Sequence, residues 1–96
     1  MVKLIWTELA LEDLKEIHEY IARDSKIYAK RQVAKIIKKA EKIYQQPLSG
    51  RVVPEFSNER IREIFEGNYR IICKIDYEAI IIMRIDHSAR LLKAIK

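Results

Sequence analysis

The sequence contains a single cysteine, Cys73, and only two histidines among its 96 residues. One cysteine cannot form an internal disulfide, and neither it nor the histidines stand at a spacing typical of metal ligands. The lack of cysteine pairs excludes a disulfide-stapled scaffold and suits a reducing compartment. We therefore expect a cytoplasmic protein without a metal site or a cofactor.

Long apolar runs are missing as well. The apolar segment Met1–Trp6 is roughly half as long as the hydrophobic region of a signal peptide, and no segment approaches the roughly 20 residues of a membrane span. Glycine and proline are scarce, and both prolines and Gly50 fall within residues 47–58. These absences predict one domain, residues 1–96, with no linker, repeat or membrane segment.

The sequence is rich in charge of both signs, with cations in excess. Nineteen Lys and Arg against 14 Asp and Glu give a formal net charge of +5. This excess favours polyanions or acidic protein segments as partners. Many of the cations lie within residues 26–45, where a charge run most often means a solvated helix face and otherwise indicates a ribosome or DNA contact.

The apolar residues recur with helical period in two stretches near the N-terminus. Val2–Trp6 has the composition of a strand, and Thr7 can cap a helix over residues 8–23. Asp24-Ser25 breaks that helix and caps a second one, which ends near Gln45-Gln46-Pro47. The connection is short, so the two helices should form an antiparallel hairpin.

The C-terminal half alternates apolar and polar residues instead. Strands are predicted at residues 61–66, 69–76 and 79–86, with Gly67-Asn68 as a tight hairpin turn. Residues 47–58 read as an ordered surface loop. The element order β-α-α-β-β-β predicts an α+β fold in which the helical hairpin packs on one face of a mostly antiparallel sheet.

Strict alternation assigns the side chains of the last two strands to two faces. The face predicted to lie in the core carries Tyr69, Ile71, Cys73 and Ile75 with Ala79, Ile81, Met83 and Ile85. The opposite face carries Arg70, Ile72, Lys74, Ile80, Ile82, Arg84 and Asp86. We expect this second face to be a mixed apolar and cationic surface that can hold a polyanion.

Several short segments, taken in order, are similar to those of a known superfamily. They are Trp6-Thr7, Asp13-Leu14, Tyr20-Ile21-Ala22, Gly50-Arg51-Val52-Val53-Pro54-Glu55, Ile61-Arg62-Glu63, Asn68-Tyr69-Arg70-Ile71-Ile72 and His87-Ser88-Ala89-Arg90. Together they resemble the RelE/ParE toxins of type II toxin-antitoxin systems, in particular the plasmid-stabilisation proteins. The resemblance implies a growth-inhibiting toxin that a cognate antitoxin neutralises in a hetero-oligomer.

The superfamily divides into two classes with the same fold. One class cuts messenger RNA on the ribosome, and the other, resembling ParE, inhibits DNA gyrase without chemistry of its own. This sequence lacks the lysine-rich loop of RelE and has no tyrosine near His87 or Arg90. The long helical hairpin and the contexts of Trp6 and Gly50-Arg51 look more like ParE, so the resemblance favours the gyrase class. A basic binding module that inhibits nothing is the third hypothesis.

The nuclease alternative would be a metal-independent endoribonuclease that uses the RNA 2′-hydroxyl. It requires a base, cations at the phosphorane and an acid, and the resemblance offers Glu55, Arg70 and His87 for these roles. Phosphate or partner contacts are predicted for Arg51, Arg62, Lys74, Arg84 and Arg90. The structural alternatives are a turn-capping or ion-paired Glu55, a core-facing His87 and an antitoxin-facing Arg70. Beyond the site residues, we expect the antitoxin to cover the cationic sheet face and the groove beside the helices.

Overall fold

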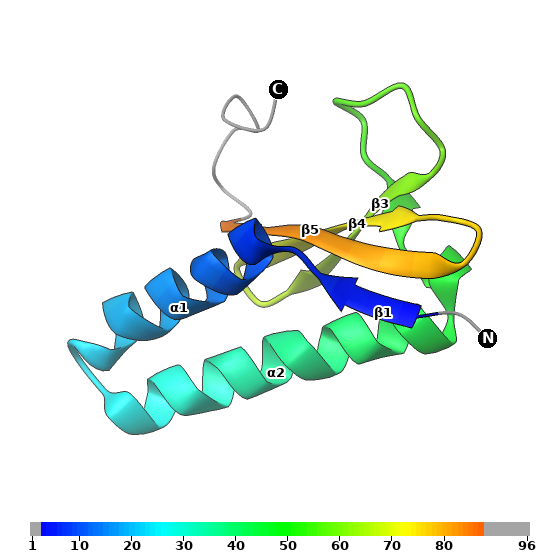
Figure 1. The fold of residues 1–96 in the computed structure, drawn as a ribbon. Helices are drawn as coiled ribbons and strands as arrows, with labels where there is room; N and C mark the ends of the chain where they lie inside the picture. The colour runs from blue at the N-terminus through cyan, green and yellow to red at the C-terminus, as the bar shows by residue number, and fades with distance from the viewer. Residues whose placement is uncertain (1–2, 88–96) are drawn as a thin grey trace.

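Two helices and one five-stranded sheet make up the computed structural model, which describes residues 3–87 (Figure 1). The elements are β1 (Lys3–Trp6), α1 (Glu8–Ala22), α2 (Lys26–Gln45), β2 (Arg51–Val52), β3 (Ile61–Glu66), β4 (Tyr69–Ile75) and β5 (Ala79–His87). The sheet order is β1-β5-β4-β3-β2, with β1 parallel to β5 and every other pair antiparallel. The predicted α+β fold is confirmed. The two-residue strand β2 and a short 3-10 helix, Pro47–Ser49, were not predicted.

Both predicted helix caps are present. The hydroxyl of Thr7 accepts the amide N–H of Ala10 at 3.1 Å, and that of Ser25 accepts the amide N–H of Tyr28 at 3.1 Å. Each bond satisfies one of the amide groups that the first turn of a helix leaves free. Thr7 also donates its hydroxyl to the Met83 carbonyl at 2.9 Å, which ties the start of α1 to β5.

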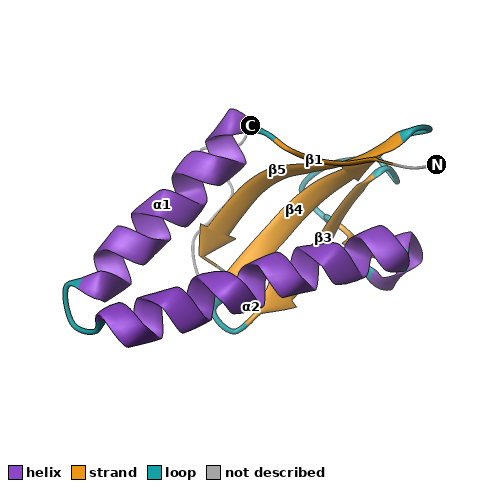
Figure 2. Ribbon diagram, turned by 60° about the horizontal axis from the view of Figure 1, so that its bottom comes forward, coloured by secondary structure: helices purple, strands orange, loops and turns teal. Residues whose placement is uncertain are grey.

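The helices cover one face of the sheet, as predicted (Figure 2). In that view α2 runs across β3 and β4, whereas α1 lies beside β5. The main core lies between the layers, and its fully or nearly fully buried residues are Ala10, Leu14, Ile36, Ala40, Ile43, Ile71, Cys73, Ile80, Ile82 and Ile85. Apolar area removed from water in this core stabilises the fold at about 25 cal/mol per Å².

The predicted inward face of β5 is wrong in the first half of the strand. Ile80 and Ile82 are buried in the core, whereas Ile81 and Met83 are only half-buried on the other side. The reason is a β-bulge: Cys73 pairs with Ile82 and the preceding residue of β4 pairs with Arg84, so Met83 is an extra residue. A bulge shifts the alternation by one residue and moves side chains to the opposite face.

The sheet face away from the helices, here called the outer face, is also less open than predicted. The loop after β2 folds over it, and Val53 and Phe56 pack with Ile61 and Ile72 in a second, smaller apolar cluster. Ile72 is fully buried, and Arg70 is only 7% exposed. The expectation of a broad mixed apolar and cationic surface is therefore wrong at Ile72, Ile80, Ile82 and Arg70.

The β3–β4 connection is the predicted two-residue turn, because Glu66 pairs with Tyr69 across Gly67-Asn68. Gly67 has φ 57°, a conformation that side-chain-bearing residues rarely adopt. This turn fixes the register of β3 on β4, and it thereby sets which charged side chains meet on the outer face. Neither helix in the described part of the chain has the length and apolar character needed to cross a bilayer.

Candidate functional site

A cluster of four charged residues occupies the outer face: Arg51, Glu55, Glu63 and Arg70, here called the arginine–glutamate cluster. Its centre is Glu63, whose side chain is completely buried. Arg70 donates to the Glu63 carboxylate through Nε at 2.9 Å and through Nη2, and Arg51 donates through Nε. In the β3–β4 register Phe65 stands opposite Arg70, so Glu63 lies diagonally across from Arg70 on the same face.

Glu55 joins the cluster from the loop after β2. Its carboxylate lies 3.5 Å from Nη1 of Arg70, and its side chain is 32% exposed. Burial alone lowers the pKa of Arg70, but the hydrogen bonds and charges of Glu63 and Glu55 outweigh that effect and raise it. Arg70 is therefore a permanently charged group whose charge is already neutralised inside the protein.

Arg51 and its neighbours make up the exposed rim of the cluster. The Arg51 side chain is 64% exposed, and its guanidinium lies 5.4 Å from the Phe65 ring centroid, a cation–π contact. Arg62 is turned toward the main chain, donating to the carbonyls of Glu59 at 2.7 Å and Gly50 at 3.2 Å. Of these two predicted contact residues, Arg51 has the more exposed side chain, whereas Arg62 is bonded to the main chain on both sides of β2.

His87 lies elsewhere. It is exposed at the end of β5, and its ring meets that of Tyr69 edge-on at 5.6 Å between centroids. Tyr69 packs against the main core on the helix side, and Arg70, the next residue, faces the outer side. The structure thus brings Glu55 and Arg70 together and places His87 across the sheet from them. Arg90 lies outside the described residues.

The other predicted contact residues are on or near β4 and β5. Lys74 is half-buried and forms no ion pair within residues 3–87. Arg84 binds Asp13 of α1 with two bonds, Nε to Oδ2 at 2.9 Å and Nη2 to Oδ1 at 3.1 Å. These hydrogen bonds raise the pKa of Arg84 against the effect of burial. Arg84 is therefore committed to the contact between α1 and the sheet.

Asp13 and Glu63 are the two important residues that our site prediction missed. Asp13 also accepts the amide N–H of Ile85 at 2.9 Å. Strand β1 pairs with β5 only as far as Ile82, so Asp13 supplies a hydrogen-bond acceptor for this part of the β5 edge. The sequence contains a signal that could have identified each residue. Asp13 stands three residues after Ala10 within the apolar stripe of α1, and Glu63 is placed diagonal to Arg70 by the predicted Gly67-Asn68 turn.

A groove of about 710 Å³ opens on the helix side, at the end of the sheet where β5 finishes. We call it the tyrosine groove, and its ring-bearing lining residues are Tyr20, Tyr28, Tyr69 and His87. Burial raises the pKa of Tyr69, and the neighbouring Tyr28 and Tyr20 raise it further. Gln32 also lines the groove. It is 7% exposed, and its amide nitrogen has no hydrogen-bond partner among residues 3–87. Buried donors of this kind are rare unless something binds them.

The described residues offer no obvious place for a metal, since no three His, Cys, Asp or Glu side chains among them are grouped suitably. Cys73 is fully buried, and burial raises its pKa to about 11. The thiol is therefore a small core group without nucleophilic character at neutral pH.

A family model described as the ParE toxin of the type II toxin-antitoxin system parDE matches residues 4–92. The chain belongs to this family of toxins. Among solved structures, this ParE-family chain is similar to one from a chromosomal ParDE system of P. aeruginosa, with 23% identity, coverage of 91% of this chain and 96% of that one, and a TM-score of 0.76.

The fold is also shared with a second toxin-antitoxin structure. A chain of the RelBE2 complex of Mycobacterium tuberculosis matches with 21% identity over 90% of this chain and 96% of that one, at a TM-score of 0.65. No protein of curated function matches the sequence. The predicted membership of the RelE/ParE superfamily is thus confirmed, and both matched structures come from systems that pair a toxin with an antitoxin.

Proposed function

We propose that this ParE-family toxin arrests growth by binding DNA gyrase and does not cut RNA. The observation that carries the proposal is the separation of the three candidate catalytic residues. Cleavage through the 2′-hydroxyl needs base, cation and acid within hydrogen-bond reach of one ribose and its phosphate. Glu55 and Arg70 share the outer face, whereas His87 packs on Tyr69 on the helix side.

The arginine–glutamate cluster also contains no histidine, the residue that most often serves as general acid. Arg51 and Arg70 are guanidinium groups that stay protonated, and the pKa of Arg70 is raised further. Glu63 is completely buried and is ion-paired with both arginines. This inventory, together with the family match and the ParDE-like fold, supports a toxin that acts by binding.

The proposal is tested by induced expression in bacteria, followed after growth arrest by mapping of messenger RNA ends and by a gyrase supercoiling assay with purified toxin. We expect intact messages and blocked supercoiling. Glu55→Ala and His87→Ala, each checked for folding by circular dichroism, should remain toxic. New cleavage ends within translated codons with unaffected gyrase would replace the proposal by the nuclease. Normal growth with verified soluble toxin would replace it by the non-toxic binding module.

We further infer that the antitoxin is seated in the tyrosine groove as well as along the exposed rim at Arg51. The unpartnered Gln32 amide supports this placement, because a backbone carbonyl of a bound chain would satisfy it. The exposed Tyr20 and Tyr28 offer broad rings of the type that anchor interfaces. Both rings and the amide line the same groove.

A matched pair of substitutions on α2 tests this antitoxin-binding site. Gln32→Met removes the buried donor at similar volume, so it should leave folding stability unchanged or raised while weakening binding of the antitoxin encoded beside the toxin gene by about tenfold. Gln45→Met alters an exposed residue of the same helix and should have no effect. Equal affinities for Gln32→Met and wild type, measured by calorimetry, would place the antitoxin elsewhere. Charge reversal at Arg70 or Arg84 is a poorer test, since both arginines hold the fold together.

A further inference from the structure

The excess positive charge of this protein resides on one helix. Helix α2 carries seven cations and one acid: Lys26, Lys30, Arg31, Lys35, Lys38, Lys39, Lys42 and Glu41. Its net charge is 7 − 1 = +6, and because the whole chain has +5, the other residues together sum to 5 − 6 = −1. The basic character that favours polyanionic partners is therefore a property of α2 alone.

The lysines of α2 take no part in the ion pairs described within the fold. Every ion pair described within residues 3–87 has arginine as its cation, and none includes a lysine. The first turn of α2 contains Lys26 and no acidic residue, so the cation faces the positive end of the helix dipole. Repulsion among like charges spaced four residues apart destabilises a helix further. Only Lys42, in the last turn, is placed favourably in the field of the helix dipole. The remaining lysines of α2 gain no described ion pair in return for this repulsion.

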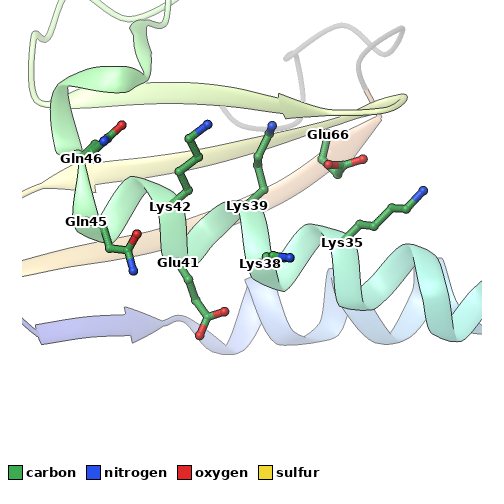
Figure 3. A pocket seen from close by; sticks show the side chains of 8 residues that line it. All are labelled: Lys35, Lys38, Lys39, Glu41, Lys42, Gln45, Gln46 and Glu66. Carbon is green, nitrogen blue, oxygen red and sulfur yellow. The ribbon is translucent and has the colours of Figure 1, made fainter.

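Four of these residues form a stripe on one helix face: Lys35, Lys38, Lys39 and Lys42, here called the lysine stripe. Their spacing of three, four and seven residues spans about 10 Å of the helix axis. Figure 3 shows Lys35, Lys39 and Lys42 extended toward the same side, with Glu41 pointing away. The stripe borders an open groove of about 510 Å³.

The composition of this groove distinguishes between partners. Its lining residues are Lys35, Lys38, Lys39, Glu41, Lys42, Gln45, Gln46 and Glu66, and none of them is apolar. Protein interfaces are anchored by aromatic and other apolar side chains and are depleted in lysine at their centre. The four lysines outnumber the two acids of the groove, Glu41 and Glu66. Lysine and glutamine side chains are groups that contact phosphate oxygens. The chemistry of the groove matches a phosphate backbone better than an acidic protein segment.

We propose that the lysine stripe binds the phosphate backbone of duplex DNA. The choice of DNA over RNA rests on the proposed gyrase function, since gyrase holds a DNA duplex. The stripe lies on α2, which covers the sheet face opposite the arginine–glutamate cluster. The toxin can therefore contact DNA through α2 while the outer face remains available to protein partners.

The proposal predicts how strongly DNA binding depends on salt concentration. Four phosphate contacts predict a slope of about −3.6 for the logarithm of the association constant against the logarithm of salt concentration, from about −0.9 per neutralised phosphate. Raising the salt from 50 to 200 mM should then weaken binding about 150-fold. With two contacts removed, the slope should fall to about −1.8 and the loss to about 12-fold.

The experiment is fluorescence anisotropy of a labelled 20-base-pair DNA duplex titrated with purified toxin at several salt concentrations. The test variant is Lys35→Gln/Lys42→Gln, and the matched control is Lys3→Gln/Lys15→Gln, which removes the same charge at exposed positions outside the stripe. We expect the slope to halve in the test variant and to stay near the wild-type value in the control.

Four outcomes would overturn the proposal, and the first is a toxin that binds no DNA. An equal loss in the control would show a net-charge effect, tighter binding of a duplex RNA of the same sequence would assign the stripe to RNA, and tighter binding of polyglutamate would assign it to an acidic protein segment. Gyrase is absent from the assay, so a toxin that binds no DNA leaves the gyrase proposal standing. A toxin that binds DNA without blocking supercoiling refutes the gyrase proposal alone.

Discussion

Removing the buried carboxylate of Glu63 should be among the most damaging single changes in this protein. The Glu63 side chain is completely buried, and the side chain of its partner Arg70 is 8% exposed. Glu63→Leu would leave the Arg70 guanidinium buried without its closest counter-charge, and Glu55 lies farther away at 3.5 Å. Breaking a buried ion pair by deleting one partner typically costs about 3 to 5 kcal/mol. A domain of this size has a free energy of unfolding on the order of 5 to 14 kcal/mol.

The assay is urea denaturation followed by circular dichroism, together with a thermal melt. The Glu63→Leu variant should lose at least about 3 kcal/mol, which corresponds to a melting temperature lower by about 12 °C or more. Glu55→Gln is the control, because it removes a carboxylate that touches the same arginine but is 32% exposed. Its cost should stay at about 1 kcal/mol or below.

A second variant separates the buried charge from a simple packing defect. Glu63→Leu/Arg70→Met replaces the pair by apolar groups of similar volume, and such replacements are often neutral or stabilising. The double variant should therefore recover most of the stability lost by Glu63→Leu. A single variant within about 1 kcal/mol of wild type, or a double variant no better than the single one, would refute the reasoning.

Three further predictions concern the other buried contacts and the turn. Asp13→Ala leaves the Ile85 amide and the Arg84 guanidinium without their acceptor, so it should cost about 2 to 4 kcal/mol in urea and speed hydrogen exchange at Ile85; unchanged exchange there would contradict it. Burial raises the pKa of Cys73 from 9.0 to about 11, so the folded state keeps a proton that the unfolded state loses. The contribution of this thiol to the free energy of unfolding should therefore be unchanged below pH 9 and fall as the pH rises to about 11. The Cys73→Ala variant should show a shallower fall, and the difference from wild type separates the effect of the thiol from that of the tyrosines and lysines. Gly67→Ala should lower the melting temperature by about 4 to 8 °C because φ is 57° there, whereas its Cβ would meet only ordinary contacts.

The elements themselves were predictable because their signals are local. Thr7 and Ser25 cap helices through bonds to amides three residues away, and Gly67-Asn68 joins two strands without intervening residues. Such features depend on a few neighbouring residues. The bounds of both α-helices and of the longer strands, and the α+β class, therefore followed from apolar periodicity and from capping and turn residues. The two-residue strand β2 and the 3-10 helix did not.

The bulge in β5 was not predictable in this way, because distant residues favour it. Thr7 donates to the Met83 carbonyl and Asp13 accepts the Ile85 amide, so contacts more than 70 residues apart in sequence stabilise the edge of β5 around the extra residue. Alternation alone assumes an unbroken pleat. The same limit applied at the site, where the burial of Arg70 depends on a loop whose path no short-range pattern records.

Arginines and lysines have different roles in this structure. The described ion pairs all use arginine, whose fork of donors suits the two-point contacts that hold Glu63 and Asp13. Lysine, a mobile point charge, is excluded from those pairs and concentrated on α2. A structural role would favour the residue with fixed geometry, and contact with a regular row of phosphates tolerates the flexible one. The division between the two cations therefore separates the charges that build this toxin from those that are available to a partner.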